Sequence, residues 1–310
     1  MSPTRVLLVP ILALLGIAPA YAGGTEPGSF LLFPEFDNRP GQATYLTVTN
    51  VNGSTTSGSV RLHLNYVDAA NCQVVNRFAV LTPRDTLTVV AAAHAVGVER
   101  GYMWCYAQSM TGVPIDFDHL IGACLRIDGV TGTEYSLPPL VLQGVPGAGL
   151  PTDVNGNGKR DLDGVEYERA PRTIYVPRFT GQSAEPLPRG TASSDIVLLH
   201  PLAGPGVTTS TAWLVWNDNE EVFSLDTSFS CWTRRSLLSV SGVFGAAFLA
   251  ATNDDPLEVV GAPTIETGWF QVRATSATGP GGSTVTPQVF GFLAERRPYG
   301  AADLPFVEDL

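Results

Sequence analysis

The sequence predicts an all-β protein, and three observations support that fold class. The 310 residues include 32 Gly and 24 Pro, and only 15% of them are charged, a composition typical of a chain rich in turns. Short segments alternate apolar and polar side chains with the two-residue period of half-buried strands, whereas no long helical period with caps occurs. Several segments of the first half also recur in the second half in the same order.

The individual elements follow from local pattern. Residues 91–96 predict a short helical turn, and the apolar run 237–251, interrupted by Gly and Ser, predicts buried strands joined by a turn. Alternating or β-rich composition predicts strands at residues 45–49, 60–66, 102–106 and 223–229.

The recurring segments predict two tandem, duplicated β-sandwich domains of the immunoglobulin-like or jelly-roll-like kind. Short β segments resemble one another by chance, but equal order with nearly equal spacing favours duplication, and Asn50 should then superpose on Asn217 and Gly101 on Gly268. Units of about 120 residues suit sandwiches of seven to nine strands. The matching segments are 33–36 with 176–179, 47–52 with 214–219, 101–107 with 268–274, and 120–122 with 289–291.

Composition also predicts the domain boundaries. Residues 144–151 are rich in Gly and Pro and precede a dense acidic loop, as is common between domains. The predicted organisation is a signal peptide at 1–22, a first sandwich at 23–143, a linker at 144–172 and a second sandwich at 173–310.

The first 22 residues have the three parts of a secretory signal. Arg5 gives a positive start, residues 6–18 are apolar, and Ala20-Tyr21-Ala22 provides a small-x-small cleavage pattern before Gly23. The apolar stretch is shorter than the ~20 residues that a membrane span requires. We therefore expect a secreted, periplasmic or cell-surface protein whose mature chain has no membrane span.

Export makes disulfide bonds possible. The four cysteines are Cys72, Cys105, Cys124 and Cys231, which allow three pairings and form neither a zinc motif nor a CxxC motif. Three of them lie in the first half, which favours a bridge there, although free buried thiols are also compatible with the sequence.

The charge balance excludes two classes of partner, nucleic acids and acidic membrane surfaces. Acidic residues outnumber basic ones 29 to 18, the isoelectric point is about 4.7, and Lys159 is the only lysine. Nucleic acid and polybasic membrane attraction both need clustered basic side chains. The expected partner is therefore an extracellular protein or a glycan.

The segment 153–166, DVNGNGKRDLDGVE, is the strongest local motif. It resembles the DxDxDG calcium loops of EF-hands, dockerins and thrombospondin type 3 repeats. The resemblance implies a Ca²⁺ ion held by oxygen atoms of Asp153, Asn155, Asn157, Asp161 and the carbonyl of Lys159. Gly164 stands where an EF-hand has its bidentate Glu, so Asp163 or Glu166 must close the shell.

The bland interpretation of this segment is a solvated turn, because it contains two Asn-Gly dipeptides. A plain turn does not need acids at both ends, so we expect a structural calcium ion that stiffens the loop between the domains.

Catalytic signals are weaker. Residues 116–119, DFDH, place two carboxylates beside an imidazole, but they follow a turn and more simply begin an exposed strand. No GxSxG or HExxH motif occurs, and the four histidines are scattered. The sequence favours a non-catalytic protein with a structural, adhesive or ligand-binding role. The alternative is an extracellular hydrolase or carbohydrate-active protein with dispersed catalytic residues.

Four tryptophans lie in the second half: Trp213, Trp216, Trp232 and Trp269. Exposed indole rings stack on sugars, whereas core packing explains buried ones without a ligand. Trp213 and Trp216 are three residues apart and should face opposite sides of one strand, so at least one belongs to the core.

Overall fold

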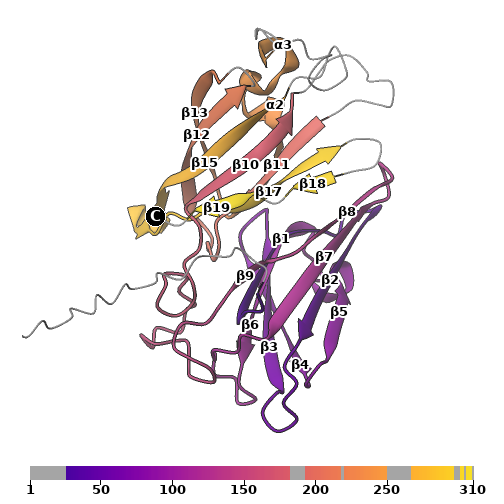
Figure 1. Ribbon diagram of the computed structural model, residues 1–310, viewed down its shortest axis with the longest axis vertical. Coiled ribbons are helices and arrows are strands. Elements are labelled where there is room, and N and C mark those ends of the chain that lie inside the picture. Colours follow the sequence, from indigo (N-terminus) through magenta and orange to yellow (C-terminus); the bar gives the residue numbers. More distant parts are fainter. Residues whose placement is uncertain are drawn as a thin grey trace, which may run out of the picture.

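The computed structural model describes residues 26–181, 193–217, 220–249, 267–296, 301–303 and 305–308. These residues form an all-β protein of two packed sandwiches, as predicted (Figure 1). The predicted signal peptide and the expected new N-terminus at Gly23 lie outside the described ranges. Within those ranges, no helix is long and apolar enough to cross a membrane.

The first sandwich, unit 1, packs two antiparallel sheets with the strand orders β4-β3-β6-β1-β9 and β5-β2-β7-β8. The predicted strands and the short helical turn of this half are confirmed. The elements are β1 (Phe30–Asp37), β2 (Gln42–Asn50), β3 (Val60–Asp68), β4 (Val74–Leu81), β5 (Thr86–Val90), α1 (Ala91–His94), β6 (Arg100–Gln108), β7 (Leu120–Asp128), β8 (Thr133–Leu137) and β9 (Leu140–Leu142).

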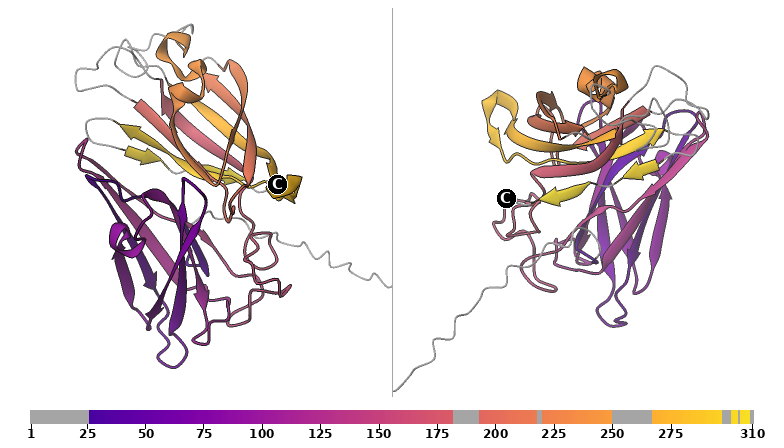
Figure 2. Two further views of the ribbon diagram at one scale, coloured as in Figure 1. Left: turned by 180° about the vertical axis from the view of Figure 1, so that it is seen from behind. Right: turned by 45° about the horizontal axis from the view of Figure 1, so that its top comes forward.

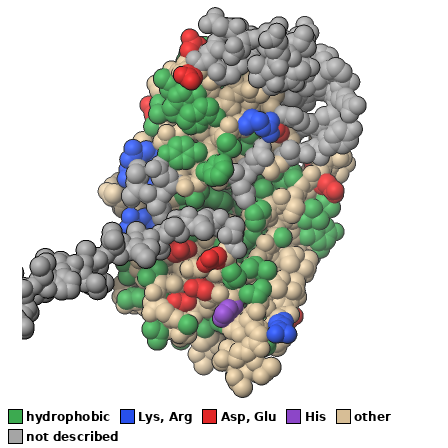
Figure 3. All heavy atoms as spheres, viewed as in Figure 1, with side chains coloured by type: hydrophobic (Ala, Val, Ile, Leu, Met, Phe, Trp, Pro, Cys, Tyr) green, Lys and Arg blue, Asp and Glu red, His purple; other side chains and the backbone are tan. Residues whose placement is uncertain are grey.

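The second sandwich, unit 2, has the orders β13-β12-β15-β10-β19, with β16 added to β15, and β14-β11-β17-β18. Its elements are β10 (Thr173–Thr180), β11 (Ser193–Leu199), β12 (Thr208–Asn217), β13 (Val222–Phe229), β14 (Trp232–Ser236), α2 (Leu237–Val240), η1 (Gly242–Phe244), α3 (Ala246–Leu249), β15 (Thr267–Thr278), η2 (Pro280–Gly282), β16 (Thr284–Val285), β17 (Phe290–Arg296), β18 (Ala301–Asp303) and β19 (Phe306–Glu308). Hydrophobic side chains gather over the part of this unit around β12 and β13 in Figure 3.

The prediction for residues 237–251 is wrong in its secondary structure. Where buried strands were expected, α2, η1 and α3 form three short helical turns, of which Leu237, Phe244 and Leu249 are buried. A short apolar run has no clear period, so strand and helix cannot be separated by pattern alone.

The two units have the same strand order, position by position. Strands β1 and β10 each carry an irregularity in register, between Phe33 and Phe36 and between Val176 and Phe179. Directly after it, Phe36 pairs with Gly101 and Phe179 pairs with Gly268. The equivalence of the two glycines, which the duplication predicted, is therefore present in the register of both sheets.

The expected superposition of Asn50 on Asn217 is wrong. Asn50 ends β2, whereas Asn217 ends β12, which takes the place of β3 in its sheet. Asp68 of β3 pairs with Gly101, and Asn217 pairs with Gly268, so these two are equivalent. The matched sequences resembled each other as generic strand ends.

The units share a hydrophobic cluster besides their own inner cores. Phe30 and Tyr102 of unit 1 pack in one buried cluster with Leu199 and Phe292 of unit 2. The side chains come from the outer face of the β4-β3-β6-β1-β9 sheet and from the outer face of the β14-β11-β17-β18 sheet. The views of Figure 2 show unit 2 seated on unit 1 in this way.

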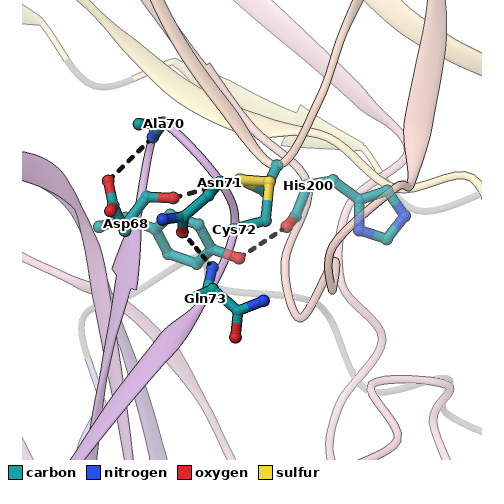
Figure 4. The surroundings of a disulfide bond; sticks show 8 residues. Asp68, Ala70, Asn71, Cys72, Gln73 and His200 are labelled. Atoms are coloured by element: carbon teal, nitrogen blue, oxygen red, sulfur yellow. Dashed lines mark hydrogen bonds between the residues drawn. A yellow bond between two sulfur atoms is a disulfide. The ribbon is translucent and has the colours of Figure 1, made fainter.

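A disulfide bond joins the units at one side of this contact. Cys72, in the turn between β3 and β4, is bonded to Cys231, and Cys105 and Cys124 are free and buried. In Figure 4, His200 lies beside the bridge, and its carbonyl accepts the Tyr102 hydroxyl at 3.2 Å. The expected bridge within the first half is wrong, because its other two cysteines point into the inner core of unit 1.

Polar contacts complete the joint. Arg234 Nη1 lies 2.7 Å from the carboxylate of Glu35, which also accepts the Tyr135 hydroxyl, and Trp232 Nε1 donates to the carbonyl of Pro34 at 2.9 Å. Glu35 is almost fully buried between the units. Core, disulfide and ion pair together hold the two sandwiches in one relative position.

Candidate functional site

The acidic loop between the sandwiches is wound by hydrogen bonds from its backbone to its own side chains. Asp153 Oδ2 accepts from the amide of Gly158 at 3.1 Å. Asn155 Oδ1 accepts from the amide of Asn157 at 2.9 Å, and Asn157 Oδ1 accepts from the amide of Lys159 at 2.6 Å. The first three predicted ligand side chains therefore hold one tight coil of backbone.

Two later acids belong to the same coil. Asp161 Oδ2 accepts from the side-chain amides of Asn155 at 2.8 Å and Asn157 at 3.0 Å. Glu166 is buried beneath the loop, where its two oxygens accept from the backbone amides of Val154 and Asp161, both at 3.1 Å. Burial raises the pKa of Glu166. Its carboxylate is thus occupied in bracing the backbone.

The remaining predicted ligand stands apart, since Asp163 accepts from the amide of Val165 in a turn of its own. Asp153 has its second oxygen, Oδ1, shielded from solvent without a hydrogen-bond partner among the described residues, while Oδ2 also pairs with Arg160 at 3.2 Å. In the described ranges no three His, Cys, Asp or Glu side chains gather as a metal site. A cation here would need amide and carbonyl oxygens as well, which is the donor set that Ca²⁺ accepts.

The loop forms one wall of a groove of about 870 Å³ between the units. Strands β3 and β6 of unit 1 supply the floor, including His63 and Asn65, and Asn76 of β4 lies at its edge. The opposite wall comes from unit 2, from the turn after β11 and from the segment between β16 and β17. The groove is of the size that small-molecule sites usually have.

The floor of the groove is aromatic. The rings of Trp104 and Tyr106, which line the groove, lie nearly parallel with centroids 5.8 Å apart, and the buried ring of Phe30 continues the row 5.5 Å from that of Trp104. The ring of His63 lies 5.1 Å from that of Tyr106, and the guanidinium carbon of Arg160 lies 5.2 Å above the same ring. Trp104, His63 and Arg160 thus surround Tyr106 and all line the groove.

A chain of hydrogen bonds fixes the histidine. Gln108 Nε2 lies 3.4 Å from the Tyr106 hydroxyl, which lies 2.7 Å from His63 Nδ1. These contacts hold the imidazole ring against the Tyr106 hydroxyl, which can either donate to Nδ1 or accept from it. Burial lowers the pKa of His63, Arg61 and Arg160 lower it further, and the neighbouring Asn76 side chain partly offsets them.

Three nitrogen atoms around the groove have no hydrogen-bond partner among the described residues: Trp104 Nε1, Arg160 Nη1 and His63 Nε2. All three are shielded from solvent. A buried donor without an acceptor costs about 1–3 kcal/mol, so a ligand oxygen that reached it would recover that free energy.

The two carboxylates of the acid–base pattern at residues 116–119 accept hydrogen bonds from backbone amides and a hydroxyl group. Asp116 is buried and accepts from the amide of Gly147 at 2.7 Å. Asp118 accepts from the Ser29 hydroxyl at 2.6 Å and from the amide of Gly144 at 2.9 Å, and burial raises its pKa to about 6. Both carboxylates anchor the start of the linker to unit 1.

The tryptophans divide as their spacing required. Trp213 is buried in the core of unit 2 and Trp232 lies at the joint between the units. Trp216 and Trp269 stack on each other outside the sheet, with ring centroids 3.8 Å apart and planes at 2°.

The sequence singled out Lys159, Asp161 and Asp163 in the wall of the groove, but not the residues of its floor. His63 and Asn65 were recognised only as the polar side of a strand, and Trp104 and Tyr106 as part of a β pattern. The signal that could have found them is alternation: along each strand these side chains alternate with core residues, so each set lies on the outward face of its strand.

Comparison with known proteins adds little. No protein-family model matches the chain, and no curated protein matches it. One similar solved structure is protein 1070 of Thermotoga maritima, with a TM-score of 0.30, 10% identity, and coverage of 40% of this chain and 98% of that one. Another is a lectin from Pleurotus ostreatus in complex with GalNAc, with a TM-score of 0.17, 10% identity, and coverage of 95% and 80%. Both TM-scores are too low to support an argument.

Proposed function

We propose that this protein is an exported, non-catalytic glycan-binding protein that holds a saccharide in the groove between its two units. A calcium ion bound by the 153–166 loop would stiffen one wall of the groove. The observation that carries the proposal is the aromatic floor, at which an indole N–H and a guanidinium N–H lack acceptors.

A saccharide matches both properties of the floor. The apolar face of a pyranose ring packs on an aromatic ring, and Trp104 is the partly exposed ring of the row. Sugar hydroxyl and ring oxygens are acceptors for Trp104 Nε1 and Arg160 Nη1. The amides of Asn65 and Asn76, which also line the groove, donate and accept and suit the hydroxyl groups.

The calcium proposal rests on the loop's oxygen atoms. Asp153, Asn155, Asn157 and Asp161 share one coil with the Lys159 carbonyl in the ligand order of DxDxDG loops, and Asp153 Oδ1 is without a partner among the described residues. The expected dissociation constant is about 10⁻⁴ M, as in extracellular modules. Its effect would be local, since the shared core and the disulfide already fix the units.

Export is supported by the signal-like first 22 residues and by the disulfide, since such bonds persist in oxidising compartments.

The test of the groove is saccharide binding by the mature protein, first on a glycan array and then by calorimetry. We expect Trp104→Ala to weaken binding at least tenfold, because it removes both the stacking surface and the donor. Phe248→Ala, which removes an exposed aromatic ring that does not line the groove, is the matched control. Loss of binding in the control but not in Trp104→Ala would place the site elsewhere, and binding of no glycan would reject the proposal.

The test of calcium is separate. The double variant Asp153→Ala/Asp161→Ala should lose the calorimetric heat of calcium binding and the rise in melting temperature with millimolar calcium. Asp226→Ala, which removes an exposed acid of β13, should keep both. Equal responses of the two variants would count against a calcium loop while leaving the saccharide site open to its own test.

A further inference from the structure

The contact between the units uses different faces of the same fold. We call the outer face of a unit's larger sheet, β4-β3-β6-β1-β9 or β13-β12-β15-β10-β19, its front face, and the outer face of its other sheet its back face. The front face of unit 1 packs against the back face of unit 2 in the shared cluster. Such a contact is heterologous, and among the described residues it leaves the front face of unit 2 and the back face of unit 1 unused.

The unused front face is most apolar where its counterpart is buried. Val67 and Tyr102 pair across the front face of unit 1 and are 1% and 0% exposed beneath unit 2. The equivalent pair in unit 2 is Trp216 and Trp269, which stack only on each other in the ring contacts of the described chain. Trp269 is 36% exposed and the neighbouring Val222 is 53% exposed.

The unused back face of unit 1 also exposes an apolar side chain where the equivalent position of unit 2 is buried, but fewer of its side chains are apolar. On the back face of unit 2, Leu199 pairs with Phe290, and both are buried by unit 1. The equivalent pair in unit 1 is Thr49 and Ile121, and Ile121 is exposed, as is Leu125 on the same strand.

We propose that the front face of unit 2 binds the back face of unit 1 of a second copy of this chain, so that molecules associate head to tail. This goes beyond saccharide binding and does not depend on it. The internal contact is the template: the same two kinds of face meet in the same order, and each free face exposes apolar side chains at the positions that the internal contact buries.

The intermolecular contact would be reversible, unlike the internal one. On the back face of unit 1, Thr49 stands at the position that Leu199 has in unit 2. Asp85, just before the strand that pairs with β2, stands at the position of Cys231, just before the strand that pairs with β11. The contact therefore buries less apolar surface and has no disulfide. A heterologous contact does not close by itself, so the assembly should lengthen as concentration rises.

The test uses two variants and sedimentation velocity. Trp216→Ser/Trp269→Ser disables the front face of unit 2, and Ile121→Asp/Leu125→Asp disables the back face of unit 1. The wild type should form concentration-dependent oligomers, and each variant alone should be monomeric. Because each variant keeps the face that the other has lost, an equimolar mixture should form dimers only.

Other outcomes overturn the proposal. A wild type that is monomeric at hundreds of micromolar would reject it. If the back-face variant still dimerised alone and the mixture gave no new species, two tryptophan faces would be meeting each other instead. Val130→Asp, in the exposed turn after β7, is the control and should assemble like the wild type. Dimer formation in the mixture itself shows that both variants are folded.

Discussion

Arg126 of β7 and Glu295 of β17 occupy the same position in the two units but carry opposite charges. The strand register shows this equivalence. Gly122 of β7 pairs with Val48, Gly291 of β17 pairs with Leu198 at the corresponding place, and Arg126 and Glu295 each follow their glycine by four residues. Their partners are exchanged as well.

The exchanged partners lie on β1 and β10. Arg126 Nε lies 4.0 Å from Glu35, and Glu295 lies 2.8 Å from Arg178, the residue equivalent to Glu35. The hydroxyl beside each pair is retained, since Thr44 donates to the Asp37 carbonyl at 3.3 Å and Ser194 to the Thr180 carbonyl at 3.2 Å. Both units thus place an ion pair at this position, with opposite polarity.

The first prediction compares two arginines on one carboxylate. Arg126 and Arg39 contact Asp37 Oδ2 at 2.9 and 2.6 Å, but their side chains are 4% and 43% exposed. Arg126→Ala should lower the free energy of unfolding by about 1–3 kcal/mol, because it removes a buried hydrogen-bond donor from Asp37 and leaves that carboxylate with Arg39 alone. Arg39→Ala should cost under about 1 kcal/mol. Urea unfolding of both variants measures this, and equal losses would contradict it.

The second prediction concerns pH. Burial raises the pKa of Asp118 from 3.8 to about 6, so between these values the native state holds a proton that the unfolded chain has released. The contribution of Asp118 to stability therefore falls as pH rises from about 4 to 6. Asp118→Asn should remove this fall and, allowing for solvent screening, gain about 1 kcal/mol at pH 7.

The readout for Asp118 is the melting temperature across that pH range. Asp226→Asn, an exposed acid, should leave the slope of the wild type unchanged. A wild-type slope retained in Asp118→Asn would assign the titration to another group.

The third prediction concerns the disulfide. The bond between Cys72 and Cys231 closes a loop with a sequence separation of 159. Chain entropy gives such a bridge about 4–5 kcal/mol, so Cys72→Ser/Cys231→Ser should melt well below the wild type. Reductant should lower the melting temperature of the wild type and leave that of the variant unchanged. A similar response of both would mean that the bridge does not form.

The fourth prediction uses the two equivalent glycines. A Cβ on Gly101 would lie 1.8 Å from the carbonyl oxygen of Val67, and one on Gly268 would lie 2.4 Å from that of Trp216. Each Gly→Ala change should therefore cost at least about 2 kcal/mol, because the strands must separate. Gly242→Ala, where no atom lies within 4 Å of the new Cβ, is the control and should have little effect. A cost for the control alone would contradict the equivalence.

The sequence predicted the features that local pattern controls. Alternation located the strands, and the recurrence of Gly101 at Gly268 predicted two units of one design. Prediction from the sequence was wrong where tertiary packing determines the structure. Asn50 and Asn217 end different strands, and residues 237–249 form helical turns. The coil of the acidic loop follows from its Asn and Gly residues, whereas the groove beside it depends on how the units pack, which no local period records.

The bridge between the units has a consequence for folding as the chain emerges. Cys72 appears long before Cys231, since 159 positions separate them, and meanwhile Cys105 and Cys124 appear as competing thiols. Burial of those two thiols in the core of unit 1 before oxidation would protect the native pairing. In that order of events, the first sandwich forms with Cys72 unpaired, and the bond forms when the second sandwich arrives.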